Sequence, residues 1–422
     1  MPRNELTRKV YEIMEREMQD IGPFIVRKQC LQIHVDPENI EPANLAQLAA
    51  NLSEVMVLFG GHEKARKIYS ELRKLKDLDL LVKEETSEGT KLKMTEELGK
   101  GSLFAGDWPK AKEYFEQLLA DANARKDQLA KTRYMKWLGT VHQEQGEFDQ
   151  ALQRFEAALA IAKGLSNKAE LANCYNSIGD VRWYKGDHAK AIDAYRLAAS
   201  DAESAGFLIG VGIAHVGIGN VLADRHELDE SIKSYLTALE RLKYTEEFQQ
   251  IARAYNNLGD TYRQKKNWDD ALKCFGKSEE YGDKGGWLNM VAWARFNSAM
   301  VLVDKGSLPE AEGLLRKSEA SLVQIGDRTG LAGAKHVWGK LYAAKGDAAQ
   351  MDRAYTEAIE RYRVLKTPFS EAECHNELGM AHKKLGNRTK ALDHLRMAAV
   401  IYTDLKLDKW AKVAVKEIES MG

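Results

Sequence analysis

Residues 251–278 read IARAYNNLGDTYRQKKNWDDALKCFGKS, and their pattern predicts two short antiparallel helices joined by a tight turn. The Leu258-Gly259 pair begins a ladder that recurs every 40 residues: Gly99, Gly139, Gly179, Gly219, Gly259, Ala299, Gly339 and Gly379. A ladder of mostly small residues lies 12 residues later: Ala111, Ala151, Ala191, Ser231, Ala271, Ala311, Met351 and Ala391. A ladder of large residues lies four further on: Phe115, Phe155, Tyr195, Tyr235, Phe275, Leu315, Tyr355 and Leu395. Eight units in register, without an insertion, predict an all-α repeat solenoid.

The residue types of the unit follow from close packing of its two helices. The ladder glycine on the first helix leaves room for the large residue on the second helix. A further glycine, such as Gly186 or Gly346, supplies the left-handed conformation that ends the first helix. Because neither helix can bury its apolar face alone, neighbouring units must stack into one continuous core.

The unit resembles the tetratricopeptide repeat in Leu258-Gly259, Tyr262, Ala271 and Phe275, which stand at that family's spacing. The usual period is about 34 residues. A period of 40 is similar to the long-period subclass of kinesin light chains and of polarity adaptors that bind short peptides. The resemblance implies a right-handed superhelical α-solenoid whose first helices line a concave groove.

The composition limits which kinds of partner the protein can be expected to bind and in which compartment it can be expected. The chain carries 62 basic and 63 acidic residues, and this balance argues against a nucleic-acid partner. No apolar run approaches the length of a membrane span, and the charged start lacks the apolar region of a signal peptide. We therefore expect a cytoplasmic protein. Four cysteines make no disulfide framework, and we expect Cys174 and Cys374 to be buried packing residues.

The pattern predicts three parts. These are a helical module over residues 1–85, eight repeats over 86–406 and a capping helix over 407–422. Within the module we expect four helices, with Gly60-Gly61 ending the third. The capping helix should gather one apolar side and leave the other wet. That apolar side is predicted to hold Trp410, Val413, Ala414 and Ile418.

Some short motifs resemble catalytic or metal-binding signatures, but their place in the predicted structure does not suit that chemistry. The Gly276-Lys277-Ser278 tripeptide resembles the end of a P-loop but falls inside a second helix. The glycines of residues 210–219 are explained better by close helix packing. His375 and His382 stand seven residues apart on one helix, yet no third metal ligand is evident nearby. We expect no enzyme activity, no cofactor and no metal.

One face of each first helix is the candidate binding surface. Counted from the ladder glycine, positions −6, −3, −2, +1, +4 and +5 form a stripe at helical spacing. Its side chains vary between repeats, which suits recognition better than packing. From repeat two to repeat eight the candidates are Arg133, Lys136, Asn173, Asn176, Asp180, Asn220, Arg253, Asn256, Asn257, Asp260, Arg263, Trp293, Phe296, Asn297, Met300, Lys340, Asn376 and Lys383.

Asparagine recurs within this stripe. Its amide donates and accepts at once, which suits an extended peptide backbone. The alternative, that the asparagines bond to neighbouring repeats, stays open. The carboxylate clamp that the family uses for chaperone tails is rejected. Asn220 and Asn257 match two of its elements, but Val216, Trp293 and Asn297 stand where it needs basic residues.

The sixth repeat is unusual because its stripe is apolar: Trp293, Phe296, Met300 and Val303. Exposed apolar patches usually mark a contact, and tryptophan is a frequent binding anchor. We expect an apolar socket here, with Gly333 leaving space beside Trp293. Three basic residues should flank it: Arg253, Arg263 and Lys340. The alternative is that this stripe is buried within the protein.

The sequence predicts a scaffold that holds a peptide or helix of a protein partner in its groove. A second hypothesis is a regulatory subunit whose N-terminal module binds a small ligand or dimerises while the repeats relay the state. A pocket in residues 1–85 with converging polar groups would favour it. Homo-oligomers remain open, because the module and the groove could dock head to tail.

Overall fold

A computed structural model describes residues 4–19, 21–79, 82, 87–405 and 407–421, and no strand occurs among them. The N-terminal part holds α1 (Glu5–Met18), α2 (Ile21–Gln32) and α3 (Pro42–Leu75). The predicted end at Gly60-Gly61 is wrong, because α3 runs through both glycines as one helix. Apolar residues on both sides of the pair are buried, including Leu52 and Leu72. Packing along one face therefore outweighs about 1 kcal/mol lost per mid-helix glycine.

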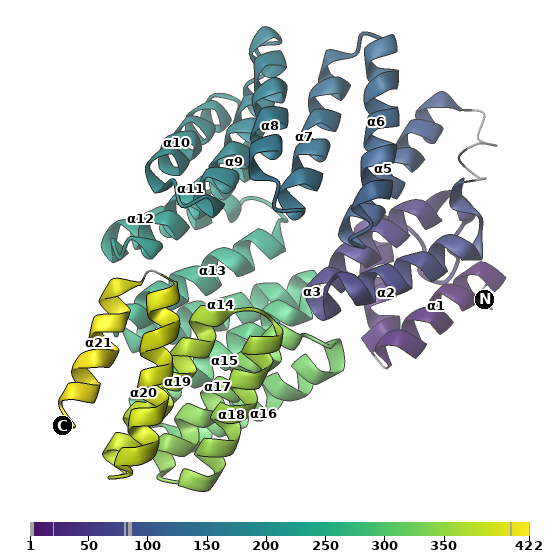
Figure 1. The fold of residues 1–422 in the computed structure, drawn as a ribbon. Helices are drawn as coiled ribbons and strands as arrows, with labels where there is room; N and C mark the ends of the chain where they lie inside the picture. The colour runs from purple at the N-terminus through teal and green to yellow at the C-terminus, as the bar shows by residue number, and fades with distance from the viewer. Residues whose placement is uncertain (1–3, 20, 80–81, 83–86, 406, 422) are drawn as a thin grey trace. The chain divides into compact units, whose positions relative to one another are not determined.

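The repeats follow as pairs of helices whose starts keep the 40-residue interval (Figure 1). The first helices are α5 (Glu88–Phe104), α7 (Gln128–Glu144), α9 (Lys168–Tyr184), α11 (Leu208–Asp224), α13 (Phe248–Gln264), α15 (Leu288–Lys305), α17 (Arg328–Lys345) and α19 (Pro368–Lys384). The second helices are α6 (Trp108–Ala124), α8 (Phe148–Gly164), α10 (His188–Ser204), α12 (Leu228–Leu242), α14 (Trp268–Gly285), α16 (Leu308–Ile325), α18 (Ala348–Val364) and α20 (Arg388–Asp404). The all-helical α-solenoid is thereby confirmed.

The ladder glycines pack against the large residues, as predicted. A Cβ added to Gly139 would lie 2.5 Å from the Phe155 ring, and one on Gly339 would lie 2.6 Å from the Tyr355 ring. In the sixth repeat Ala299 takes the place of the ladder glycine, and both Ala299 and Leu315 are buried. The glycines of α11 serve the same end, since a Cβ on Gly212 would lie 2.5 Å from Leu242.

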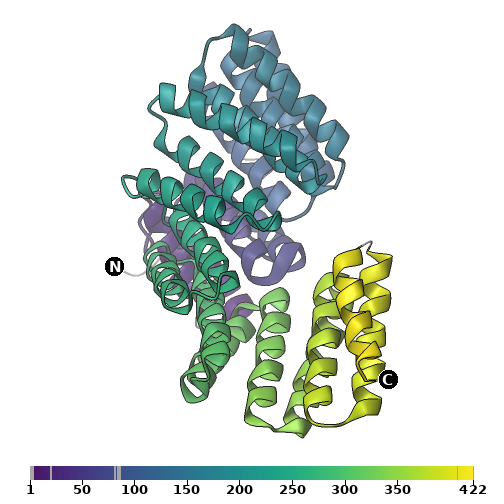
Figure 2. The ribbon, with the colours of Figure 1, turned by 90° about the vertical axis from the view of Figure 1, so that its left-hand side faces the viewer.

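The chain forms two compact units that divide within α14. One holds Met1–Asp270 with Glu280–Trp287, and the other holds Ala271–Glu279 with Leu288–Gly422. In each unit first helices also contact one another, α7 with α9 and α9 with α11 in one, and α15 with α17 and α17 with α19 in the other. Figure 2 shows the green-to-yellow helices of the second unit standing side by side. First helices therefore share one side of each stack.

The last helix, α21 (Asp408–Glu419), packs against α20 in the register of a further first helix. Its buried side holds Ala411 and Ala414, whereas Trp410 is 38% exposed and Val413 is 51% exposed. The predicted apolar side was therefore wrong for Val413. The exposed Lys412 occupies the position that holds a buried, mostly small residue in the preceding repeats: Thr132, Ala172, Gly212, Ala252, Ala292, Ala332 and Ala372.

Candidate functional site

A hollow of about 380 Å³ opens on the first-helix side of the second unit. Its walls come from α15, α17 and α19, and α18 supplies part of its floor. Val303, Met380 and Leu385 give it apolar surface, while Lys340, Asn376 and Glu377 give it polar groups. A few placed polar groups in an apolar hollow are typical of a binding site.

Glu377 is the centre of the polar floor. Its Oε2 lies 2.6 Å from His336 Nε2 and accepts a hydrogen bond from the Tyr355 hydroxyl at 3.1 Å. Its Oε1 lies 3.5 Å from Lys340 Nζ, which in turn lies 3.8 Å from Asp304 Oδ1. Burial alone would raise the pKa of Glu377, but His336 and Lys340 outweigh it and lower the pKa to about 2.

His336 carries the matching positive charge. Burial opposes that charge, but Cys374 and Glu377 hold the pKa of His336 well above its ordinary value. Charge-assisted contacts of this kind are stronger than neutral ones. The floor of the hollow is therefore fixed by paired charges.

The asparagines divide into two groups. Asn176 is buried and donates to the Gly210 carbonyl at 3.3 Å, and Asn257 donates to Asn220 Oδ1 at 2.9 Å. These amides join neighbouring repeats, and Asn256 and Asn297 also interact with other residues. Asn376 lines the hollow, and no hydrogen bond joins its amide to another described residue. The alternative left open by the sequence holds in the first unit, whereas Asn376 keeps the role of a binding candidate.

Other predicted stripe residues are bonded within their units. Lys136 Nζ lies 2.6 Å from Glu170, and Arg133 lies 3.5 Å from Glu96. Asp180 accepts from the Tyr195 hydroxyl at 2.6 Å, as Asn220 does from Tyr235 at 2.7 Å. Arg263 pairs with Asp260 at 2.7 Å, and Lys383 pairs with Glu417 at 2.6 Å. These stripe residues are therefore already bonded within the protein, either inside one repeat or to the next. Arg253 is exposed, and Asn173 is half-buried.

The apolar stripe of the sixth repeat is half-buried rather than open. Phe296 and Met300 pack against a core cluster that includes Trp338. The Trp293 indole donates to Asp327 Oδ2 at 2.6 Å. A Cβ on Gly333 would lie 3.5 Å from the Phe296 ring, so the space lies beside Phe296. Only Val303 of this stripe is among the residues that line the hollow.

Sequence reasoning missed His336 and Glu377, the two residues that fix the floor. Both stand at stripe positions, −3 and −2 from their ladder glycines, so the spacing could have found them. A lone histidine or glutamate on a helix carries no signature by itself, so the residue types alone did not indicate a site. Their complementarity across repeats appears only once α17 and α19 are adjacent.

Comparison with known protein families finds the same repeat that the sequence pattern predicts. Residues 128–204 and 210–283 match the tetratricopeptide repeat family model. These residues are tetratricopeptide repeats. No curated protein sequence matches the chain. Several solved structures share its fold at low sequence identity.

Aspartyl phosphate phosphatase F from Bacillus subtilis is 14% identical with a TM-score of 0.58, and the match covers 86% of this chain and 94% of that one. The apo quorum sensor NprR from B. thuringiensis is 16% identical with a TM-score of 0.57, covering 82% and 96%. The Rap conjugation gene regulator of plasmid pLS20 in complex with the Phr* peptide is 14% identical with a TM-score of 0.52, covering 87% and 97%. At such identities these likenesses show the fold.

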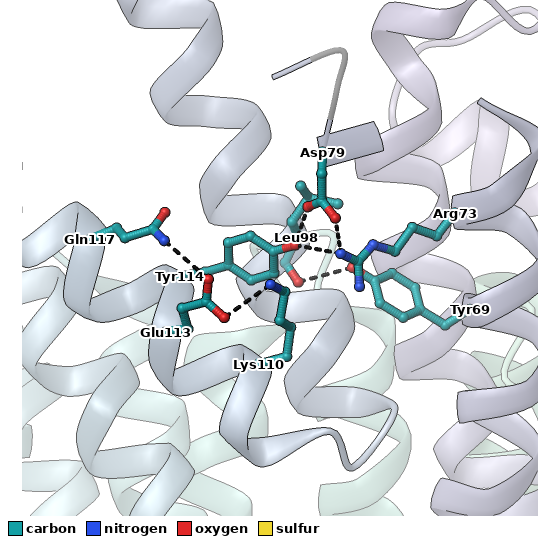
Figure 3. Close-up of polar contacts among 8 residues, drawn as sticks. All are labelled: Tyr69, Arg73, Asp79, Leu98, Lys110, Glu113, Tyr114 and Gln117. Carbon is teal, nitrogen blue, oxygen red and sulfur yellow. Dashed lines mark hydrogen bonds and ion pairs between the residues drawn. The ribbon is translucent and has the colours of Figure 1, made fainter. Parts of the chain in front are cut away.

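The chain also has a polar pocket of about 560 Å³ where α3 meets the first repeat. Figure 3 shows Arg73, Asp79 and Tyr114 converging there. Arg73 donates to the Tyr114 hydroxyl at 2.9 Å and pairs with Asp79, to which Tyr114 also donates. Burial would raise the pKa of Asp79, but hydrogen bonds from Tyr114 and Arg73 and the Arg73 charge lower it. The polar groups are bonded to one another and join α3 to α6.

In the part of the chain that the structure describes, no helical stretch combines the length and low charge of a membrane span.

Proposed function

We propose that this chain is a non-enzymatic interaction scaffold and that the hollow of its second unit binds a peptide or helical segment of a protein partner. The observation that carries the proposal is the hollow itself, where the Asn376 amide lies beside apolar side chains of three first helices. An amide without a protein partner can pair with a peptide backbone, and Met380 and Val303 can hold an apolar side chain.

The fold neighbours support a peptide ligand. One of them is a quorum sensor, and another was solved in complex with the Phr* peptide. Apolar side chains exposed in the hollow would give affinity, because each buried methylene contributes roughly 0.8 kcal/mol. The remaining candidates of the sixth repeat, Trp293, Phe296 and Met300, would shape the neighbouring wall from behind.

Site-specific photocrosslinking tests the proposal. A benzoylphenylalanine at Ala344, which lines the hollow, should crosslink a defined partner in extracts of the native cell. The same residue at the exposed Leu197 of α10 is the matched control. Asn376→Ala combined with Met380→Glu should abolish the Ala344 crosslink without changing the melting temperature. Equal crosslinking from both positions, or a crosslink that survives the double variant, would contradict the proposal.

The second hypothesis, a regulatory subunit with a ligand-binding N-terminal module, is favoured by the pocket between α3 and α6. Arg66, Ser70 and Lys74 line it together with the Arg73–Asp79 pair. A ligand there would compete for Arg73 and so loosen the joint. To test this, the shift in melting temperature caused by pools of metabolites is measured for the wild type and for Arg73→Ala. A stabilising compound that acts on both proteins alike would rule the pocket out.

A further inference from the structure

Three histidines gather between the helices of the last repeat. His375 and His382 belong to α19, and His394 belongs to α20. His375 Nδ1 lies 3.0 Å from His394 Nδ1. The His382 and His394 rings are nearly parallel at 7°, with centroids 6.1 Å apart. His375 and His382 are buried, so water has little access to either ring.

The contact between the two Nδ1 atoms sets a limit on protonation. One ring must donate its N–H and the other must accept with a lone pair, so only one of the two can carry a proton there. His375 Nε2 and His382 Nδ1 are buried without a hydrogen-bond partner. Protonating the accepting nitrogen as well would turn this hydrogen bond into a contact between two N–H donors and would place positive charge on a buried ring.

The charges around the cluster are mixed. From α18, Asp352 Oδ1 lies 2.7 Å from His382 Nε2, and the Arg363 charge acts on His375. From α20, Lys390 and Asp393 act on His394. Asp352 is shared, because Lys390 Nζ lies 2.5 Å from its Oδ2. Among the described residues, no carboxylate is bonded to the His375–His394 contact that could stabilise an added proton.

We propose that the His375–His394 contact of this cluster is an acid-sensitive clasp, which holds α19 against α20 while both rings are neutral and releases them when the accepting ring is protonated. Since α19 also carries Asn376, Glu377 and Met380, release would deform one wall of the hollow. This consequence for binding rests on the proposed function, whereas the opening of the clasp does not.

The direction of the pH response follows from the burial of the rings. Burial, then His394 and Arg363, lowers the pKa of His375 to about 4, and burial and His382 lower the pKa of His394. A histidine whose pKa is lowered by folding stabilises fully above its ordinary value of about 6.5 and loses that contribution as pH falls towards the folded value. For His375 alone, opening at pH 5 should increase about 30-fold over pH 7.5.

Hydrogen exchange of the full chain tests the clasp. Between pH 7.5 and pH 5, amides of α19 and α20, corrected for the chemical exchange rate, should exchange at least about 10-fold faster relative to those of α9 and α10. His375→Gln and His394→Gln should each flatten this pH step, because glutamine keeps a neutral amide at every pH. The exposed His226, changed to Asn, is the matched control and should keep the step.

The slope with pH is compared rather than the absolute stability, so a variant weakened at pH 7.5 remains informative. An unchanged step in both glutamine variants, or no step in the wild type, would overturn the clasp. A metal is the other chemistry that histidines offer, although no three His, Cys, Asp or Glu side chains among the described residues are arranged to hold one. If EDTA at pH 7.5 reproduced the acid effect, protonation would be the wrong explanation.

Peptide crosslinking from Ala344 at both pH values then separates the two proposals. A pH step in exchange without any crosslink would leave the clasp standing and remove the binding function.

Discussion

The first-helix stripes of the two units use similar residues for different purposes. In the first unit, Asn176 and Lys136 each bond to a residue 34 positions later, at the start of the next first helix. In the second unit, Asn376 occupies the same position in its repeat, but its amide bonds to no described residue and lies beside a hollow. Varied polar residues on a stripe are therefore compatible with either stacking or recognition. What separates the two is whether the polar group already has a partner.

The largest expected effect concerns the sixth repeat. Trp293→Ala with Phe296→Ala should lower the free energy of unfolding of the second unit by about 3 kcal/mol, because half-buried aromatic surface is lost from the core. The change also removes the indole donor of the buried Asp327. Urea denaturation followed by circular dichroism measures this loss. The 77% exposed Val364, changed to Ala, is the control for the same unit. A stable double variant with weaker partner binding would instead restore the open socket.

A second experiment asks whether both units share one packing rule. Gly179→Ala in the first unit and Gly339→Ala in the second should each cost about 2 kcal/mol, since the added methyl would lie 2.6 Å from a buried tyrosine ring. Gly313→Ala is the matched control, because its helix position has open space, and it should gain roughly 0.5–1 kcal/mol. Thermal unfolding of the three variants gives the comparison. Unequal losses at Gly179 and Gly339 would mean that packing, and not only polar pairing, differs between the stripes.

The fold could be predicted from the sequence because the ladder residues are local and periodic. The spacing of Gly339 and Tyr355 in the sequence is enough to predict their contact. The start of every repeat helix also keeps the 40-residue interval. The end of a helix at Gly60-Gly61 could not be judged in this way, because burial of apolar residues on both sides of the pair, such as Leu52 and Leu72, overrides the local cost of glycine.

The candidate site was less accessible to sequence reasoning. The face of the first helices was foreseen, and Lys340 and Asn376 do line the hollow. The sequence does not distinguish polar side chains that are already bonded within the protein from those that are not, since this bonding depends on the approach of a neighbouring repeat. His336 meets Glu377, 41 residues away, only because two stacked helices bring them within 2.6 Å.

A third experiment tests the central difference directly. Asn176→Ala should cost about 1–2 kcal/mol, because a buried bond between repeats is lost. Asn376→Ala should leave stability within about 0.5 kcal/mol but reduce the Ala344 crosslink several-fold. Chemical denaturation and crosslink yield are measured on both variants. If Asn376→Ala proved the more destabilising of the two, the contrast between bridging and binding amides would collapse.

The smallest effect is the pH dependence of the floor under the hollow. His336→Gln should cost about 1 kcal/mol, and the difference from wild type should depend on pH. Because folding raises the pKa of His336, its contribution is complete below about pH 6.5 and fades as pH rises through the folded value. Because folding lowers the pKa of Glu377 to about 2, the contribution of Glu377 is complete above its ordinary value of 4.5 and fades as pH falls towards 2. The difference should therefore be largest between about pH 4.5 and 6.5. In the first unit, Lys136→Gln breaks a lysine–glutamate pair that contains no histidine, and its cost at each pH is the reference for the His336 profile. Parallel pH profiles for the two variants would show that His336 is not the charge that fixes the floor.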